Sequence, residues 1–512
     1  MPLTRTLIDV AARRPDRIAL AGDGERLTYR QLLRSCAAVR AGVETLLGSS
    51  QPVALGASSA ETRGVPIVAV SLSRAIDAAR LLTGAISFRA VAAVLDPLWP
   101  LEHRLEILRR VEPALVITDD ADFEEHLRAS SFAGTVVSLA AFDSVAADAL
   151  ARRGDSAPGP EVRPRDEPFL LLFTSGTTDL PKGFLRTRGS WDHNVDISRR
   201  YLGVEDGRST IAPGPLSYSL TLYALVEVLA TGGSLFLQSR FDAQATARTI
   251  ATDRVERLVG VPAMLLAILQ GARRAEQPLD SLLEVITGGA NQPEHIRRSF
   301  EETRPTAHLR SYYGASEIGF IGYSDAGDGT SLMPFGGVEV SVRDESGAEV
   351  PTGETGTLNI RVGSAVERYL AATSAERITD ADGWASVGDL ASFAGGRIQL
   401  LGRAGDVAVS GGHKVSLPQV ERALASLPGC ERCCAVALPD ATLGSIVAVV
   451  VEGEAESLPA KARMLAHLRA HLAPQFVPHR LYRALALPRT AGGKIRRTAV
   501  LELVGSGDVD RL

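Results

Sequence analysis

A short apolar segment, residues 169–173, is followed by a turn that is rich in glycine and hydroxyl residues and ends near Lys182. Successive backbone N–H groups and hydroxyls in such a turn can surround phosphate oxygens, and a lysine adds a mobile positive charge. The spacing differs from the G-x-x-x-x-G-K-S/T pattern of a Walker P-loop. The turn is therefore either a phosphate-binding loop of another type or an ordinary strand connection. Its candidate phosphate-contacting residues are Thr174, Ser175, Gly176, Thr177, Thr178 and Lys182.

Four further motifs follow this turn at wide intervals. They read Ser-Tyr-Tyr-Gly-Ala-Ser-Glu at residues 311–317, Gly-Trp-Ala-Ser-Val-Gly-Asp-Leu at 383–390, Gly-Arg-Ala-Gly-Asp at 402–406 and Gly-Gly-Lys-Ile-Arg-Arg at 492–497. In this order, the five segments resemble the acyl-adenylate-forming superfamily of acyl-CoA synthetases, stand-alone and nonribosomal-peptide adenylation enzymes, and firefly luciferase. The resemblance extends from Leu27 to Arg497. It implies that ATP activates a carboxylic acid as an acyl-adenylate, which then passes to a thiol.

The implied chemistry is the attack of one anion, a carboxylate, on another, the α-phosphate of ATP. The protein must therefore neutralise charge, align the reactants and stabilise the departing pyrophosphate. By resemblance, Glu317 binds Mg²⁺ and the Ser316 hydroxyl contacts the α-phosphate. One carboxylate is chemically adequate, because waters and phosphate oxygens complete the octahedron of Mg²⁺. Lys494 is the implied bridge between the substrate carboxylate and the α-phosphate. Taken alone, Glu317 would be a solvated strand-end residue and Lys494 a surface lysine.

The nucleoside part of ATP requires flat apolar faces for adenine and a carboxylate for the ribose hydroxyls. The stacking capacity of an aromatic ring and the resemblance together assign Tyr313 and a small-residue turn to adenine. By resemblance, Asp389 binds the ribose, with Arg403 as a second contact; the alternative for Asp389 is a turn residue after a strand. The expected nucleotide-binding residues are Gly288, Gly289, Ala290, Tyr313, Gly314, Asp389 and Arg403.

Transfer to the thiol involves, in this superfamily, rotation of a small C-terminal domain. The resemblance implies that the rotation withdraws Lys494 and brings residues 409–415 to a tunnel for the pantetheine arm of coenzyme A. Gly411 and Gly412 supply the small residues that such a tunnel needs, although adjacent glycines also fit any tight turn. Gly405 stands at the hinge position, where Asp or Lys is usual, and glycine tolerates the wide backbone changes of a rotation.

Asp179 is a second departure from the family pattern, because it replaces the glycine that usually ends the phosphate turn. A carboxylate close to a triphosphate is repelled unless it points outward or toward Lys182. Because of Asp179, the alternative that the chain is a degenerate binding protein without catalytic activity remains open. Retention of Lys182, Glu317, Asp389 and Lys494 argues against that alternative.

The acid pocket is expected around residues 213–223. Amino-acid-activating relatives place an aspartate there to pair with the substrate ammonium, and Ser219 stands at the matching position. A buried ammonium without a counter-charge is costly, so an α-amino acid is disfavoured and we expect an aryl or medium-sized alkyl acid. The expected pocket residues are Tyr218 at the gate, the small residues Ser219, Gly288 and Gly319, which leave room, and Tyr223, Ile318 and Phe320 as apolar lining.

The bulk composition excludes several other classes of protein. The 512 residues carry a net charge of −5, which argues against binding to nucleic acid or to a membrane surface by bulk electrostatics. The first residues contain no sustained apolar stretch, so we expect no signal peptide and a cytoplasmic location. The longest apolar region, residues 216–237, contains Glu227 and two glycines and indicates buried core rather than a membrane span. Cys430, Cys433 and Cys434 lack the partners for a zinc site and are expected to be buried thiols.

Apolar strand patterns alternate with amphipathic helices over the first part of the chain, which predicts an α/β fold with parallel sheets covered by helices. Residues 6–80 are expected to be helical around an early turn, with Thr28 suited to cap a helix. Predicted strands lie at residues 91–95, 114–117, 135–139, 169–173, 234–237, 257–259 and 283–286. Short strands at 338–342, 357–362, 384–390 and 397–401 predict an antiparallel sheet or small barrel. A unit of α+β type follows, with helices at 417–427 and 459–472 and strands at 434–438 and 445–452.

These patterns predict a large N-terminal domain over residues 1–402 and a small, mobile α+β domain over residues 403–512. The expected function is ATP-dependent ligation of an acid to a thiol, with ATP, Mg²⁺ and coenzyme A as the required molecules. The rival acceptor is the phosphopantetheine of a separate acyl carrier protein, because no carrier site follows residue 500.

Overall fold

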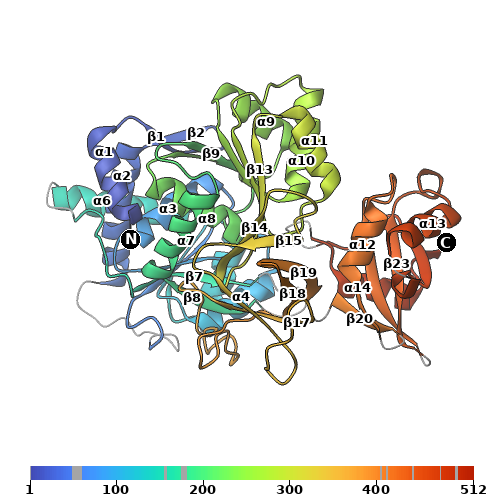
Figure 1. Cartoon of the computed structure of the whole chain (residues 1–512). Coiled ribbons are helices and arrows are strands. Elements are labelled where there is room, and N and C mark those ends of the chain that lie inside the picture. The colour runs from blue at the N-terminus through green and yellow to red at the C-terminus, as the bar shows by residue number, and fades with distance from the viewer. Residues whose placement is uncertain are drawn as a thin grey trace.

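The computed structural model describes residues 2–48, 60–154, 158–174, 181–403, 406–410, 413–440, 443–472, 474–489 and 494–512. Within these ranges the strands form three sheets, with helices packed against them (Figure 1). The predicted α/β fold class is confirmed. The helices are α1 Pro2–Arg13, α2 Tyr29–Leu47, α3 Ala75–Ile86, α4 Leu101–Val111, α5 Ala121–Ala129, α6 Leu139–Arg153, α7 Arg188–Tyr201, α8 Ser219–Ala230, α9 Ala243–Thr252, α10 Pro262–Arg274, α11 Glu294–Thr303, α12 Leu417–Ala425, α13 Lys461–His471 and α14 Arg497–Ser506.

The first sheet is parallel from its outer strand β6 to β7, and β8 closes it in antiparallel orientation. Each of its central strands is buried on both faces, as expected for a sheet covered by helices. In spatial order its strands are β6 Thr135–Ser138, β5 Leu115–Thr118, β3 Ile67–Ser71, β4 Val91–Val94, β7 Pro168–Phe173 and β8 Gly183–Thr187.

The second sheet has 13 strands among the described residues and changes character along its length. From β13 to β1 the neighbours are parallel; β2 and the strands from β14 to β16 pair in antiparallel fashion. In spatial order its strands are β16 Glu339–Arg343, β17 Thr355–Arg361, β18 Asp389–Ala394, β19 Arg397–Arg403, β15 Ser331–Pro334, β14 Gly319–Ser324, β13 His308–Ala315, β12 Glu284–Thr287, β11 Arg257–Gly260, β9 Ser209–Ala212, β10 Ser234–Leu237, β1 Ile18–Gly22 and β2 Glu25–Thr28.

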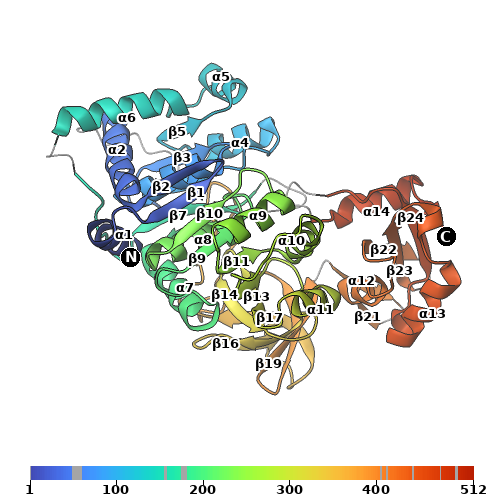
Figure 2. The same ribbon diagram turned by 90° about the horizontal axis from the view of Figure 1, so that it is seen from above.

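The third sheet belongs to the C-terminal part of the chain, which forms a separate lobe in Figures 1 and 2. This lobe contacts the larger body through α12, where Arg422 pairs with Asp328 at 3.1 Å. The Ser416 hydroxyl, which caps α12, also donates to the carbonyl of Leu401. In spatial order the strands of the third sheet are β21 His413–Ser416, β20 Val407–Ser410, β23 Gly444–Glu452, β24 Arg480–Ala484 and β25 Asp510–Arg511, with β22 Cys433–Asp440 paired to β23.

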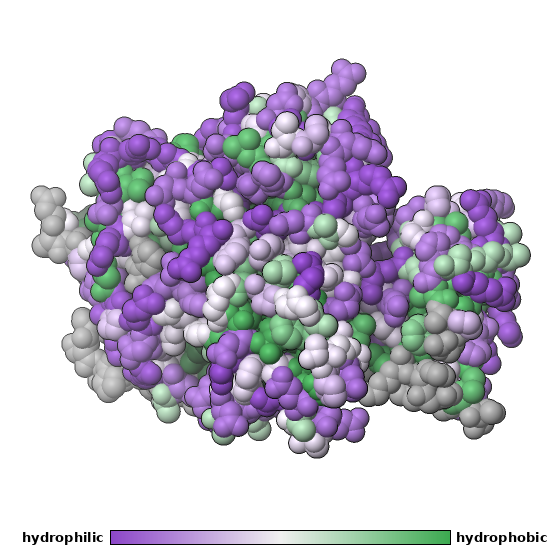
Figure 3. Space-filling model, in the orientation of Figure 1, coloured by the Kyte–Doolittle hydropathy of each residue, from purple (hydrophilic) through white to green (hydrophobic). Residues whose placement is uncertain are grey.

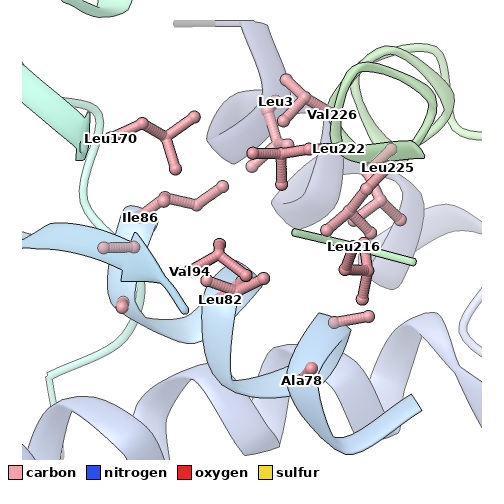
Figure 4. Close-up of a cluster of buried hydrophobic side chains, with 14 of the residues drawn as sticks. Leu3, Ala78, Leu82, Ile86, Val94, Leu170, Leu216, Leu222, Leu225 and Val226 are labelled. Atoms are coloured by element: carbon pink, nitrogen blue, oxygen red, sulfur yellow. The ribbon is translucent and has the colours of Figure 1, made fainter. Parts of the chain in front are cut away.

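The main core lies between the first and second sheets, around α8. Every residue of α8 from Thr221 to Ala230 is buried, so the prediction that this apolar region forms core is confirmed. Figure 4 shows Leu222, Leu225 and Val226 of α8 packed beside apolar side chains of α1, α3, β4 and β7. This packing stabilises the end of α8 that carries Ser219.

Four local predictions have different outcomes. Thr28 caps α2 as expected, in a reciprocal capping box with Gln31. The helical reading of residues 6–80 is wrong in part, because strands β1, β2 and β3 lie between the helices. The strand expected at 384–390 is also wrong: β18 begins only at Asp389, directly after Gly388, whose φ of +76° is incompatible with an extended strand. The antiparallel strands continue the second sheet, so they form no separate barrel within the described residues.

The surface and the cysteines agree with the expectations from composition. Figure 3 shows a face on which hydrophilic residues predominate and hydrophobic ones are scattered. Among the described residues, none of the helices combines the length and the apolarity needed to cross a membrane. Cys430, Cys433 and Cys434 are buried free thiols, and burial raises the pKa of Cys434 to about 12, so they are inert in the folded protein.

Candidate active site

The phosphate turn connects β7 to β8 across the edge of the first sheet. Its two ends are tied together, because Thr174 Oγ1 accepts from the Lys182 backbone N–H at 3.1 Å and the Thr174 N–H donates to the Lys182 carbonyl at 3.0 Å. The antiparallel pairing of β7 with β8 also brings the two described ends of this segment side by side. The predicted positions Ser175, Gly176, Thr177, Thr178 and Asp179 lie outside the described residues.

Lys182 is held beside the predicted metal ligand by two residues that the motifs do not contain. Its ammonium contacts both carboxylate oxygens of Glu376 at 2.7 Å and lies 5.3 Å from the centre of the Tyr369 ring. The Tyr369 hydroxyl donates to Glu317 Oε1 at 2.9 Å. Burial and the charge of Glu317 raise the pKa of Tyr369, so its hydroxyl remains a donor. Lys182 and Glu317 are therefore brought to one place.

The turn that carries Ser316 and Glu317 joins β13 to β14 and is fixed from three sides. Arg186 of β8, which is fully buried, donates to the Glu317 carbonyl at 3.2 Å. The Val366 N–H donates to the same carbonyl at 2.9 Å. The Ser316 hydroxyl lies 2.6 Å from that of Ser219 at the start of α8. These contacts fix the backbone and leave the Glu317 side chain to be oriented by Tyr369.

Glu317 is suited to Mg²⁺ by its chemistry. Mg²⁺ favours oxygen ligands and commonly takes one or two carboxylates, with waters and phosphate oxygens in the remaining positions. Among the described residues, no group of three or more His, Cys, Asp or Glu side chains could form a complete metal cage. The donor set therefore fits an ion that is bound jointly by one protein carboxylate and by a phosphate-bearing substrate.

Asp389 is the centre of a second group, at the start of β18. The Tyr313 hydroxyl donates to Asp389 Oδ2, and Arg403 Nε donates to Oδ1 at 3.2 Å. Burial and the negative charge of Asp389 raise the pKa of Tyr313 well above its ordinary value, so the phenol stays protonated. Three predicted nucleotide-binding residues are thus in direct contact. The charge of Glu317 acts on both Tyr313 and Arg403. The group around Asp389 therefore adjoins the group that contains Lys182 and Glu317.

Lys494 extends from the C-terminal lobe toward this second group. It directly precedes Ile495, which pairs with Arg489 as an isolated β-bridge just before α14. Desolvation by the surrounding protein and the positive charge of Arg403 lower the pKa of Lys494. The lysine is therefore close enough to the Asp389–Arg403 pair to feel its charge. Gly405, Gly411 and Gly412, the predicted hinge and tunnel residues, lie outside the described residues.

The small residues of the predicted acid pocket are packed more closely than the sequence suggests. A Cβ on Gly288 would lie 2.4 Å from the Tyr312 ring, and one on Gly319 would lie 2.6 Å from Asn194 Oδ1. These glycines therefore make space for neighbouring side chains rather than open room for a substrate. Gly289, with φ of +75°, and Ala290 form the exposed turn after β12, and Gly314 lets β13 approach the Gly319 carbonyl.

Of the predicted gate and lining residues, Tyr223 and Phe320 lie together, with ring centres 5.0 Å apart. Tyr218 precedes α8 and is half-buried. Tyr223 stacks on Trp191 with ring centres 4.2 Å apart, and its hydroxyl accepts from Asn194 at 3.2 Å. Tyr223 and Phe320 line a small cavity under the site. Ile318 belongs instead to the core beneath the antiparallel strands.

Gly319→Ala is expected to lower the free energy of unfolding by about 1–3 kcal/mol, because the added methyl group meets Asn194 and Ser364 in a backbone conformation that favours glycine. Gly327→Ala is the matched control: its φ is also positive, at +65°, and nothing lies within 4 Å of its added Cβ. Thermal unfolding of both variants measures the difference. Equal losses of stability would show that packing around Gly319 is not tight.

Comparison with known proteins identifies the family of the chain. Residues 7–370 match the AMP-binding enzyme family, and residues 419–494 match the AMP-binding enzyme C-terminal domain. The chain is 27% identical over 506 residues to an uncharacterized acyl-CoA ligase, YhfT, of Bacillus subtilis, covering 98% of both chains. It is 30% identical over 439 residues to indoleacetate–CoA ligase of Aromatoleum aromaticum, covering 81% of this chain and 84% of the relative.

A solved structure of the anthranilate CoA ligase AuaEII, in complex with anthranoyl-AMP, has the same fold. Its TM-score is 0.86 at 20% sequence identity, and the match covers 99% of this chain and 98% of that one. The chain therefore belongs to the AMP-binding enzyme family, and the resemblance read from its motifs is confirmed. It is a ligase of the acyl-CoA synthetase type.

Proposed function

We propose that the chain activates a small carboxylic acid with ATP to an acyl-adenylate and transfers the acyl group to coenzyme A. The observation that carries this proposal is the convergence of Lys182, Glu317 and Asp389 from three distant segments of the chain. Tyr369 links the first two, and the charge of Glu317 acts on the Tyr313 and Arg403 partners of the third.

Each group has a task that its contacts suit. Lys182 would exchange its contact with Glu376 for phosphate oxygens of ATP, since phosphate competes well for a lysine ammonium. Glu317 would hold Mg²⁺, which when bound neutralises charge on the triphosphate. Asp389, oriented by Tyr313 and Arg403, would accept hydrogen bonds from the ribose hydroxyls. Lys494 would add positive charge where the carboxylate oxygen meets the α-phosphate.

The substrate of this site is proposed to be an aryl or medium-sized alkyl acid, and not an α-amino acid. Ser219 presents a hydroxyl, engaged with Ser316, where a substrate ammonium would need a carboxylate. Glu227, the acidic residue further along α8, is already paired with Arg257 at 2.8 Å. Relatives that act on indoleacetate and feruloyl groups, by their names, support an aryl acid.

The proposal is tested by mass spectrometry of the products from Mg-ATP and a panel of aryl and alkyl acids, with and without coenzyme A. Acyl-CoA that appears only with coenzyme A is the expected result. Acyl-AMP that accumulates equally in both reactions would contradict coenzyme A as the acceptor and indicate a separate carrier protein. A protein that binds ATP but forms neither product with any acid would be a non-catalytic binding protein.

The alkaline limb of the adenylation rate is expected to begin below the pH at which an ordinary lysine titrates. Lys494 has a lowered pKa, so its charge is present below that pKa and is lost as the pH rises through it. In Lys494→Arg the guanidinium stays charged over this pH range. The alkaline limb of the adenylation rate is therefore expected to move to higher pH, even if the substitution lowers the maximal rate. Initial rates from neutral to alkaline pH measure both profiles. Identical limbs would exclude Lys494 as the titrating group.

A further inference from the structure

A small cavity lies between α8 and the strands β11 to β14, on the buried side of the candidate active site. Its volume is about 10 Å³, and its polar lining comes from Tyr223, Glu227, Arg257 and Tyr312, while the remaining lining is apolar. A space of this size holds about one water-sized atom. The cavity is therefore a place for a single oxygen rather than for a whole ring.

The cavity adjoins the proposed reaction centre. Tyr223 lines it, and Arg186, which donates to the Glu317 carbonyl, also donates to the Tyr223 hydroxyl at 3.4 Å. Arg257 begins β11, and Gly260 ends the strand three positions later. At about 3.3 Å per residue, this separates Arg257 from the active-site end of the strand by roughly 10 Å. An acid of about this length is therefore needed to reach from the reaction centre to Arg257.

One donor nitrogen of Arg257 is unused within the part of the chain that the structure describes. Its side chain is 1% exposed, its Nη2 contacts Glu227 Oε1 at 2.8 Å, and its Nε donates to the Leu202 carbonyl at 2.9 Å. Its Nη1 is buried and finds no hydrogen-bond acceptor among the described residues. Buried donors of this kind are rarely left unsatisfied, because desolvation without a partner is costly. In a cavity wall, such a donor points to an acceptor on a ligand.

The surrounding charges select the kind of acceptor. Glu227 already neutralises the charge of Arg257. Glu284, which lies opposite Arg257 in the pairing of β11 with β12, is a further carboxyl group on the neighbouring strand. A second carboxylate on the substrate would therefore add an uncompensated negative charge to a buried place. A neutral oxygen would accept from Nη1 without this cost.

We propose that the acid substrate carries a neutral oxygen, a hydroxyl or a carbonyl, at the end opposite its carboxylate, and that Arg257 Nη1 donates a hydrogen bond to this oxygen. The inference rests on the proposed function and assigns Arg257 as a specificity-determining residue. Glu227 orients the guanidinium through its contact with Nη2.

The test compares matched acids that differ only in the terminal oxygen: benzoate with 4-hydroxybenzoate, cinnamate with 4-hydroxycinnamate, and hexanoate with 5-oxohexanoate, with adipate as an anionic-tailed acid. Initial rates give kcat/KM for each acid, and calorimetry with a non-hydrolysable ATP analogue gives the binding constants independently of turnover. The variant is Arg257→Met with Glu227→Leu, because removal of both charges avoids a lone buried ion. Arg298→Met with Glu294→Leu, an exposed pair on α11, is the matched control.

In the wild type and the control, at least one oxygen-bearing acid is expected to exceed its plain partner by about tenfold or more, as a hydrogen bond to a charged donor allows. Adipate is expected to be poor. In the Arg257→Met/Glu227→Leu variant the ratio within each pair is expected to fall to about one. The inference about Arg257 alone would be overturned if the wild type bound or converted the acids without any preference for the oxygen-bearing members. It would also be overturned if the Arg257→Met/Glu227→Leu variant kept that preference. If no acid binds or reacts, the proposed function fails first, and this inference fails with it.

Discussion

Lys494→Ala is expected to lower the rate of acyl-adenylate formation by about 10²–10³-fold, the usual cost of removing one group that stabilises transition-state charge. The lysine is one of the cations placed near the Asp389–Arg403 pair, and desolvation together with the positive charge of Arg403 lowers its pKa. A cation held in such surroundings favours the accumulation of negative charge when a carboxylate attacks a phosphate. Pre-steady-state formation of acyl-AMP without coenzyme A measures the effect.

The second half-reaction separates this role from a structural one. Transfer to coenzyme A starting from synthetic acyl-AMP is expected to be nearly unchanged in Lys494→Ala, because the positive charge is needed only during adenylation. Lys461→Ala serves as the matched control, since Lys461 lies on α13 and contacts the Leu512 carbonyl instead. A Lys494→Ala variant with full adenylation activity would exclude the proposed role, and loss of both half-reactions would indicate damage to the fold of the C-terminal lobe.

Glu317→Gln is expected to raise the Mg²⁺ concentration needed for half-maximal activity by at least about tenfold and to lower kcat as well, because a neutral amide is a much weaker ligand than a carboxylate for a hard divalent cation. The change is nearly isosteric, and the Gln side-chain oxygen can still accept from Tyr369. The backbone of the turn is held by Arg186 and Val366 and is not affected by the substitution. Initial rates over a series of Mg²⁺ concentrations measure both effects.

Two further variants define what the Glu317 result means. Glu302→Gln makes the same chemical change at an exposed position of α11 and is expected to leave the Mg²⁺ dependence unaltered. Tyr369→Phe removes only the hydrogen bond that orients Glu317 and is expected to show a smaller shift in the same direction. An unchanged Mg²⁺ dependence in Glu317→Gln would rule out Glu317 as the metal ligand.

The sequence predicts the fold class well and identifies charged residues that the structure places near one another, because both depend on local patterns. Each of the strands expected between residues 91 and 286 is present, since an apolar run between turns has few alternatives. Thr28 is recognisable as a helix cap because its partner, Gln31, is three positions away. Lys182, Glu317 and Asp389 are recognisable because each ends a motif of small residues.

The residues that hold these groups in place are not predictable from the sequence. Glu376 contacts Lys182 across 194 positions, and Tyr369 contacts Glu317 across 52, so no local spacing indicates either pair. Both lie between β17 and the motif at residues 383–390, in a stretch without a motif of its own. Arginine side chains are usually exposed, so the sequence alone suggests that Arg186 and Arg257 lie on the surface. The structure shows that both are buried. Gly288 and Gly319 indicate close packing, but the sequence cannot say whether a substrate or a protein side chain fills the space.

The nucleotide released during turnover tests the central claim most directly, since a ligase that forms an acyl-adenylate must produce AMP and pyrophosphate. The measurement supplies Mg-ATP, coenzyme A and each acid of the panel, and quantifies AMP, ADP, pyrophosphate and phosphate beside acyl-CoA. One AMP and one pyrophosphate for each acyl-CoA, with release that depends on the acid, is the predicted result. Acyl-CoA formed together with ADP and phosphate would mean an acyl-phosphate route and would contradict the roles assigned to Lys494 and Asp389.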